Sequence, residues 1–394
     1  MPRRRPARLT NIAGIGVDKM GSIGDTAANA GLLRLENLDC DIPPDPVALA
    51  RTSSAAREDV ANSYLPFIGQ ARLRDTVARH VSNLSGVQYL GERNCLISAG
   101  GLSGILNVLL ATIEVGDEVI VTDPTYAGLL NRIRLAGGVP KFVPFDFTPG
   151  SGWKLQRDSL RGAMSPKTSA MLLMSPSMPT GGYFSADDWS VIADLCVAND
   201  LLLIYDTAME RLLFDDNPII HPAGLPGMQD RTITVGSCSK ELRMIGWRVG
   251  WIVAPEAMMP DLTAVLLANV VVPVGIAQDA VATALERSWD SQVMGPYVRE
   301  LQVRRDVVLS ELRGLPVGVP AGGWSLLLDV SDFGIDGEEA SKRLLAHGVC
   351  ATAMVGWGER HGKQYVRFVF SNEPVERLEG LGGKVKAALG IQST

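Results

Sequence analysis

Lys240 lies in the segment of this chain whose residue types and spacing most clearly indicate a reactive site. It closes the motif Ser237-Cys-Ser-Lys240 and is followed by Gly246, Arg248 and Gly250. An amine that forms a Schiff base with a phosphorylated cofactor needs groups nearby that hold the phosphate. Because Ser237 and Arg248 supply a hydroxyl and a cation, the spacing predicts a cofactor-binding lysine.

A carboxylate completes this set from a different part of the chain. Asp206 directly follows the apolar run Leu201 to Tyr205. A carboxylate that faces a pyridine nitrogen keeps it protonated, which makes the ring an electron sink for a carbanion at the substrate α-carbon. Taken singly, Asp206 could cap a helix and Lys240 could be a solvated surface residue. We expect one site instead, because ligands of open parallel sheets bind beyond the carboxyl ends of the strands.

The elements that must position these side chains are apolar runs that alternate with helical patterns. Between two of the runs, Ser185 and Asp188 predict a capped helix that extends to Asn199 and returns the chain for a parallel crossover. The alternation predicts an α/β fold with a mostly parallel central sheet and helices on both faces. Examples of these runs are Val119 to Val121, Ala170 to Met174, Leu201 to Tyr205, Thr232 to Val235 and Val249 to Val253.

A strand, a glycine turn and a helix start are predicted upstream of these runs. The run Cys95 to Ser98 leads into Gly100, Gly101 and Leu102, and helical spacing follows. Backbone N–H groups at a helix start carry partial positive charge and bind anions. We therefore expect Gly100, Gly101 and Leu102 to cradle the cofactor phosphate.

The pattern changes after residue 295, where helix and strand patterns suggest a separate α+β unit. The 394-residue chain exceeds one ordinary core. We divide it into an N-terminal arm (1–45), a large cofactor-binding domain (46–290) and a small C-terminal domain (291–394). The small domain is expected to contain a helix over Tyr297 to Leu312, a strand over Ser325 to Val330, a helix over Glu338 to His347 and a strand over Tyr365 to Phe370.

Composition argues against several other classes of protein. The net charge of −6 offers no general attraction for nucleic acid or anionic lipid, and no apolar stretch approaches the roughly 18 residues of a membrane span. Arg3, Arg4, Arg5 and Arg8 open the chain without the apolar run of a secretory signal. The five scattered cysteines favour a reducing, cytoplasmic location. Four dispersed histidines suggest neither a metal site nor a Ser-His triad.

Across residues 30 to 390 the chain resembles a class I/II aminotransferase of fold type I, in the aspartate aminotransferase superfamily. Asp117 to Tyr126 resembles that family's GDEV and P-x-Y segment. The resemblance implies that pyridoxal 5′-phosphate (PLP) is bound as an aldimine by Lys240. Tyr126 would stack on one face of the cofactor ring and Ala208 would pack on the other.

Two further matches imply the substrate and the partner. Arg367, in Tyr-Val-Arg367-Phe, matches the arginine that grips the substrate α-carboxylate through a bidentate pair. Tyr64, in Tyr64-Leu-Pro-Phe-Ile-Gly, resembles the tyrosine that reaches the phosphate of the neighbouring subunit. That match implies a homodimer with shared active sites.

Three departures from the family pattern fall in the expected pocket. Met178 replaces the second asparagine of N-P-x-N-P-T-G, and Met209 replaces the tyrosine of D-E-x-Y. Both family residues normally hydrogen-bond the phenolic oxygen of the cofactor, whereas methionine offers only a weak acceptor. The segment around Asn37, which replaces a glycine-bearing G-x-P, is expected to alter the substrate side through Asn37 to Asp39.

These features favour an aminotransferase that moves an amino group between an α-amino acid and a 2-oxo acid. A PLP-dependent lyase or cyclase acting at the α-, β- or γ-carbon is the alternative, since the missing donors imply retuned cofactor electronics. A regulator that fuses this fold to a DNA-binding domain is a third reading. An N-terminal segment of forty-odd residues and an acidic balance argue against it.

Overall fold

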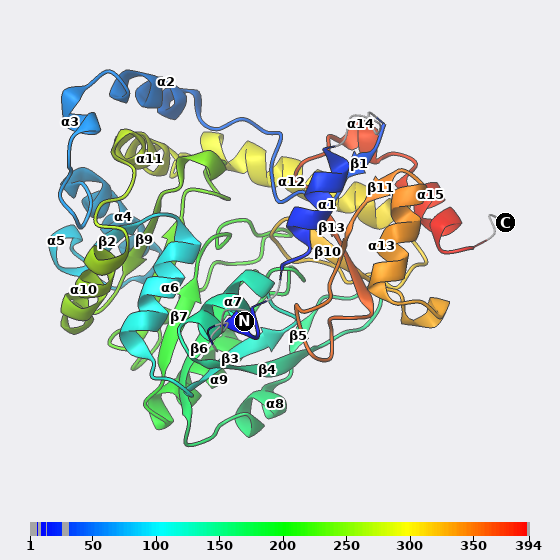
Figure 1. Cartoon of the computed structure of the whole chain (residues 1–394), viewed down its shortest axis with the longest axis horizontal. Coiled ribbons are helices and arrows are strands. Elements are labelled where there is room, and N and C mark those ends of the chain that lie inside the picture. Colours follow the sequence, from blue (N-terminus) through cyan, green and yellow to red (C-terminus); the bar gives the residue numbers. More distant parts are fainter. Residues whose placement is uncertain (1–5, 7–8, 13, 26–30, 392–394) are drawn as a thin grey trace, which may run out of the picture.

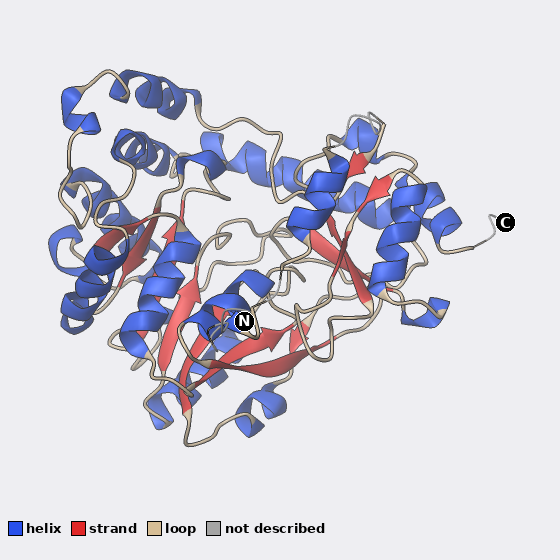
Figure 2. Ribbon diagram, viewed as in Figure 1, coloured by secondary structure: helices blue, strands red, loops and turns tan. Residues whose placement is uncertain are grey.

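The computed structural model describes residues 6, 9–12, 14–25 and 31–391, which leaves Arg3, Arg4, Arg5 and Arg8 outside the described residues. In this part of the chain the central sheet has the strand order β2-β9-β8-β7-β6-β3-β4-β5 (Figures 1 and 2). Strands β8 through β4 are parallel, whereas β9 and β5 run antiparallel to their neighbours. The predicted α/β fold with a mostly parallel sheet is confirmed. The strands are β2 (Cys95–Ser98), β3 (Glu118–Asp123), β4 (Val139–Asp146), β5 (Lys154–Leu155), β6 (Thr168–Met174), β7 (Leu202–Asp206), β8 (Thr232–Ser237) and β9 (Gly250–Val253).

Helices cover both faces of this sheet because side chains alternate along each strand. Leu172 packs with helices α6 (Gly101–Thr112), α7 (Ala127–Leu135) and α10 (Met259–Asn269). Its neighbours Met171 and Leu173 face the opposite side, toward α9 (Ala186–Ala198). At the β2 end, that side is covered by α2 (Pro46–Ala55), α4 (Ala71–Ser85) and α11 (Gly275–Arg287). None of the described helices is long and apolar enough to cross a bilayer.

Two predicted helix starts can be compared directly. Ser185 accepts the backbone N–H of Asp188, whose carboxylate accepts that of Ser185, so the predicted capping box begins α9. Helix α12 (Ser291–Glu311) begins six residues before the predicted Tyr297. The charged helical pattern suggested the later start, but Asp290 caps the helix at Gln292, and the helix continues through Pro296 although proline lacks the N–H for an intrahelical hydrogen bond.

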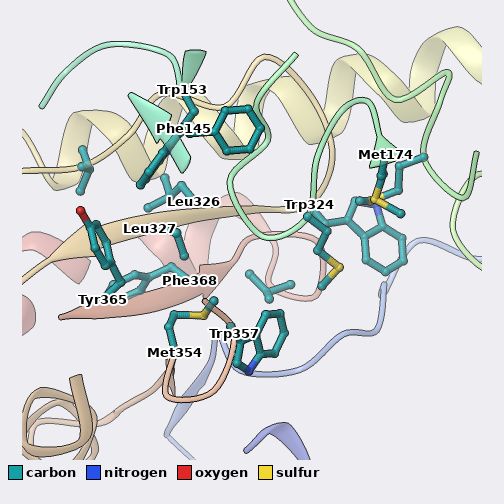
Figure 3. Close-up of a cluster of buried hydrophobic side chains, with 14 of the residues drawn as sticks. Phe145, Trp153, Met174, Trp324, Leu326, Leu327, Met354, Trp357, Tyr365 and Phe368 are labelled. Carbon is teal, nitrogen blue, oxygen red and sulfur yellow. The ribbon is translucent and has the colours of Figure 1, made fainter. Parts of the chain in front are cut away.

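The C-terminal part forms a second layered unit, in which β10 (Ser325–Asp329), β13 (Tyr365–Val369) and β12 (Thr352–Ala353) make an antiparallel sheet in the order β10-β13-β12. Helix α13 (Gly337–Ala346) packs on this sheet, α15 (Leu381–Ala388) packs against α13 and α12, and α14 (Val375–Leu378) packs against α12 (Figure 1). Figure 3 shows Phe145 and Trp153 from the large sheet's edge in the same buried cluster as Tyr365. The Trp153 and Tyr365 ring centroids lie 5.7 Å apart. The two units therefore share a hydrophobic core.

The N-terminal segment joins the C-terminal unit rather than the large sheet. Strand β1 (Leu33–Arg34) pairs in parallel with β11 (Val349–Cys350), and the backbone N–H of Val369 donates to the carbonyl of Leu35 at 2.7 Å. Helix α1 (Val17–Gly24) lies beside the same unit in Figure 1, and the Cys350 thiol donates to the Met20 carbonyl. Residues 36–41 are thereby held between the two units.

The domain boundaries predicted at residues 45 and 290 stay predictions. Two single-turn helices, α3 (Asp59–Asn62) and α5 (Gly91–Asn94), and the short α8 (Arg157–Gly162) complete the large unit.

Candidate active site

The predicted chemical residues meet at the carboxyl ends of adjacent strands. Asp206 ends β7 and is paired in register with Val235 of β8. Ser237 ends β8 and is paired with Gly250 of β9, on whose other side Ser98 ends β2. Because β2, β8 and β7 run in the same direction, their carboxyl ends share one edge. The convergence expected from the sequence therefore occurs.

A group of donors suited to an anion, called here the anion cradle, lies where β2 turns into α6. Gly100 has φ +89° and precedes the helix without any side-chain cap, so the first N–H groups of α6 remain available. A Cβ on Gly100 would lie 2.5 Å from Nη2 of Arg248, and one on Gly101 would lie 3.3 Å from Cβ of Ser237. Only glycine allows this approach at Gly100. No carboxylate of the described residues forms an ion pair with Arg248, which donates to the carbonyl of Ile245 at 3.0 Å. A phosphate ester fits this donor set, with Leu102 in the same helical turn.

A second arginine, which sequence reasoning missed, supports the cradle. Arg132 on α7 donates from Nε to the carbonyl of Leu102 at 2.8 Å and from Nη1 to that of Gly128. Burial lowers the pKa of Arg132, and the positive charge of Arg248 lowers it further. The two guanidinium groups are therefore near each other, which favours an anion between them. In the sequence, Arg132 stands in the last turn of a helix, where basic residues are ordinary.

Lys240 is held from both ends. Its Nζ donates to the carbonyl of Leu38 at 2.9 Å and lies 4.2 Å from the ring centre of Trp324. The backbone carbonyl of Lys240 accepts the hydroxyl of Tyr297 at 3.1 Å, and that hydroxyl accepts the indole N–H of Trp324 at 3.0 Å. Burial and the cation of Arg367 lower the pKa of Lys240 to about 7. An amine that loses its proton near neutral pH can act as a nucleophile and a base.

Asp206 is buried, and the backbone N–H of Ala208 donates to its Oδ1 at 3.0 Å. Burial raises the pKa of Asp206 to about 7, although that N–H and the nearby charge of Lys240 oppose the shift. A protonated ring nitrogen beside the carboxylate would stabilise its ionised form. Asp206 therefore fits a partner for the cofactor nitrogen.

Arg367 is a buried cation with unused donors. Its Nη2 donates to the carbonyl of Glu36 at 2.9 Å, while Nε and Nη1 have no hydrogen-bond partner among the described residues. Burial lowers the pKa of Arg367 to about 10. Its guanidinium carbon lies 4.8 Å from the ring centre of Trp357. Unpaired guanidinium donors in a buried site are suited to a carboxylate ligand.

The remaining predicted residues fall into two groups. Tyr126 is half-buried with its ring centroid 5.2 Å from that of Trp357, and burial raises the pKa of its phenol. Met178 and Met209 are both buried in the hydrophobic cluster that contains Trp324. A Cβ on Gly323 would lie 3.6 Å from the sulfur of Met209. The two methionines therefore share a buried cluster with Trp324, the ring beside the Lys240 amine, and Tyr126 and Ala208 pack against that cluster. The cofactor contacts predicted for these four residues stay predictions.

Tyr64 and Asn37 occupy different places. Tyr64 is 83% exposed, and its described ring contact is with Phe67 at 6.2 Å. Within one chain it is therefore not brought into the site. Asn37 is partly buried and lies between Glu36 and Leu38, whose carbonyls accept Arg367 and Lys240. The roles predicted for Tyr64 and Asn37 stay predictions.

The family model for class I and II aminotransferases matches residues 32–380. The chain belongs to this family. It is 33% identical over 332 residues to an arginine–pyruvate transaminase of Pseudomonas aeruginosa, covering 83% of this chain and 82% of that protein. It is 31% identical to an aspartate aminotransferase of Pyrococcus abyssi, covering 80% and 81%.

Solved structures agree with this assignment. The N-succinyldiaminopimelate aminotransferase of Mycobacterium tuberculosis superposes with a TM-score of 0.89 at 28% identity, covering 98% of this chain and all of that one. The predicted fold type I architecture is confirmed. As a family member, the protein is a PLP-dependent aminotransferase whose substrates are an amino acid and a 2-oxo acid.

Proposed function

We propose that Lys240 is both the covalent anchor of PLP in this aminotransferase and the group that moves the proton at the substrate α-carbon. The observation that carries this proposal is the position of its amine near the cations of Arg248 and Arg367, which both lower its pKa. Arg248 belongs to the phosphate cradle and Arg367 has free donors for a carboxylate. The amine of Lys240 therefore lies between Arg248, which would bind the cofactor phosphate, and Arg367, which would bind the substrate carboxylate.

The other residues of the site would hold the cofactor and the substrate. Bound PLP supplies an electron sink for the carbanion at the α-carbon. Asp206 would hold the ring nitrogen, while Tyr126 and Ala208 would flank the ring. The phosphate would be bound by Gly100, Gly101, Leu102, Ser237 and Arg248.

The chain's own side chains then provide the acid–base chemistry. Arg367 orients the α-carboxylate, which aligns the α-hydrogen with Lys240. Because the pKa of Lys240 is about 7, its amine accepts a proton from the α-carbon and returns one at neutral pH. Trp324 and Trp357 border the two cations and exclude water from them.

A half-reaction tests this function. Purified PLP-loaded enzyme mixed with an amino acid alone should retain the amino group on the cofactor and release about one 2-oxo acid per active site. A later addition of 2-oxo acid should restore the original spectrum. A lyase or cyclase would instead release product repeatedly without a 2-oxo acid, and that result would contradict the proposal.

We further propose a homodimer with shared sites. Large apolar side chains of α3 and its neighbours are exposed, including Val60 at 69% and Tyr64 at 83%. A Cβ on Gly275 would lie 2.4 Å from the Ala61 carbonyl, so the exposed Val274 at the start of α11 adjoins this patch. Exposed apolar patches of this kind are suited to burial against a partner.

We also propose a cytoplasmic location, because all five cysteines are unpaired.

Mixing two inactive variants tests the shared site. Tyr64→Ala should weaken cofactor binding if Tyr64 reaches the partner's phosphate. Hybrid dimers of Tyr64→Ala and Lys240→Ala chains would then contain one doubly altered site and one unaltered site. After random mixing, we expect activity in about a quarter of the sites. If Tyr64 serves its own chain, every hybrid site carries one change, and activity would not recover.

A further inference from the structure

The segment Glu36 to Asp41 forms a wall that spans the substrate side of the site. Arg367 donates to the carbonyl of Glu36 at 2.9 Å, and Lys240 donates to that of Leu38 at 2.9 Å. The next carbonyl, that of Asp39, accepts the hydroxyl of Ser371 at 2.6 Å. The wall therefore runs from the carboxylate-binding arginine to the reactive amine and continues outward through Asp39.

This wall is anchored on its outer side. Asp41 forms an ion pair with Arg304, with Nη1 2.6 Å from Oδ1. Arg304 also donates to the carbonyl of Ser371 at 2.9 Å, so one arginine holds both the wall and its neighbour. The backbone of Asp39, located between these contacts, is consequently fixed in position.

The carboxylate of Asp39 differs from the other acidic groups of the wall. Glu36 is paired with Arg34, and Asp41 is paired with Arg304. Asp39 is exposed and accepts the adjacent N–H of Cys40 at 2.8 Å, and among the described residues no lysine or arginine forms an ion pair with it. Within the described part of the chain, no cation therefore neutralises the carboxylate of Asp39, and it is available to a ligand.

The cations near Lys240 have roles in the proposed function, whereas the carboxylate of Asp39 has none. Besides burial, the cations of Arg367 and Arg248 lower the pKa of Lys240, whereas the carboxylate of Asp39 raises it. The proposed function uses Arg248 for the phosphate and Arg367 for the α-carboxylate. The carboxylate of Asp39 remains for the part of the substrate that extends away from the α-carbon.

We propose that Asp39 selects amino donors whose side chain ends in a positive charge, such as an ammonium or guanidinium group. This inference rests on the proposed function, because Lys240 and Arg367 define the substrate side. A carboxylate on this wall attracts a cationic side chain and repels a dicarboxylic amino acid.

Matched donors provide the test. Arginine and citrulline have nearly the same shape but differ in charge, so their ratio of kcat/KM in the half-reaction isolates electrostatic selection. We expect wild-type enzyme to favour arginine over citrulline by about tenfold or more at low ionic strength, and less at high salt. Asp39→Asn should lower kcat/KM for arginine by about tenfold and leave that for citrulline within about twofold.

Two more variants complete the experiment. Asp39→Lys should raise kcat/KM for glutamate relative to wild type, because it places a cation at the same position. Glu338→Gln removes an exposed carboxylate from α13 and should change neither ratio. A wild-type preference for citrulline, or a ratio that Asp39→Asn leaves unchanged, would overturn this inference alone. If no donor left its amino group on the cofactor, the proposed function would fail as well.

Discussion

Replacing Lys240 with alanine should abolish covalent attachment of PLP and lower amino transfer by at least about a thousandfold. The amine of Lys240 lies between the Leu38 carbonyl, at 2.9 Å, and the Trp324 ring centre, at 4.2 Å. Alanine removes both the nucleophile and the base. The long-wavelength absorbance of the purified protein and a single-turnover assay would measure the two losses separately.

Lys240→Arg is the matched control, since arginine keeps the positive charge but cannot form the bond. Borohydride reduction of the wild-type protein followed by peptide mapping should place the pyridoxyl group on Lys240. A pyridoxyl group on any other lysine would contradict the assignment. Because the reactive form is the neutral amine, attachment of PLP to the cofactor-free protein should accelerate as pH rises through about 7.

Restoring both family residues in one variant, Met178→Asn with Met209→Tyr, should lower the pKa of the imine nitrogen that joins PLP to Lys240 by about two to four units. Hydrogen bonds to a charged oxygen contribute about 1.5–3 kcal/mol, and one pKa unit corresponds to about 1.4 kcal/mol. New donors would stabilise the negative phenolic oxygen and weaken its hold on the adjacent proton. In the wild-type enzyme, the protonated form should therefore persist to higher pH. Titration of the long-wavelength absorbance measures this pKa.

Packing must be separated from hydrogen bonding in this experiment. Met209 is 2% exposed and approaches Gly323, so a larger ring will strain the core. Met178→Leu with Met209→Phe supplies similar changes in volume without a donor, and its pKa should stay at the wild-type value. An unchanged pKa in the Asn and Tyr variant would show that the two methionines fill core space and do not tune the cofactor.

Local sequence patterns predicted much of the fold, because helix caps and apolar runs each involve only a few neighbouring residues. The capping box at Ser185 and Asp188 starts α9, and the runs before Asp206 and Ser237 become β7 and β8. Parallel strand order then brings their ends to one edge without any knowledge of side-chain packing. The start of α12 was misplaced, because a cap at Asp290 outweighed the breaking tendency of Pro296.

By itself, then, the sequence indicated a mostly parallel sheet between helices, the strand-end set of Asp206, Ser237, Lys240 and Arg248, and the family with its cofactor. The tertiary structure decided how that set is enclosed. The bond from Lys240 to Leu38 joins residues 202 positions apart, and the bond from Arg367 to Glu36 joins residues 331 apart. Such contacts depend on how two units pack around an anchored segment, and no local spacing specifies that packing. That packing leaves Arg367 with free donors and Asp39 with an unpaired carboxylate, and the proposals about the substrate rest on these two groups.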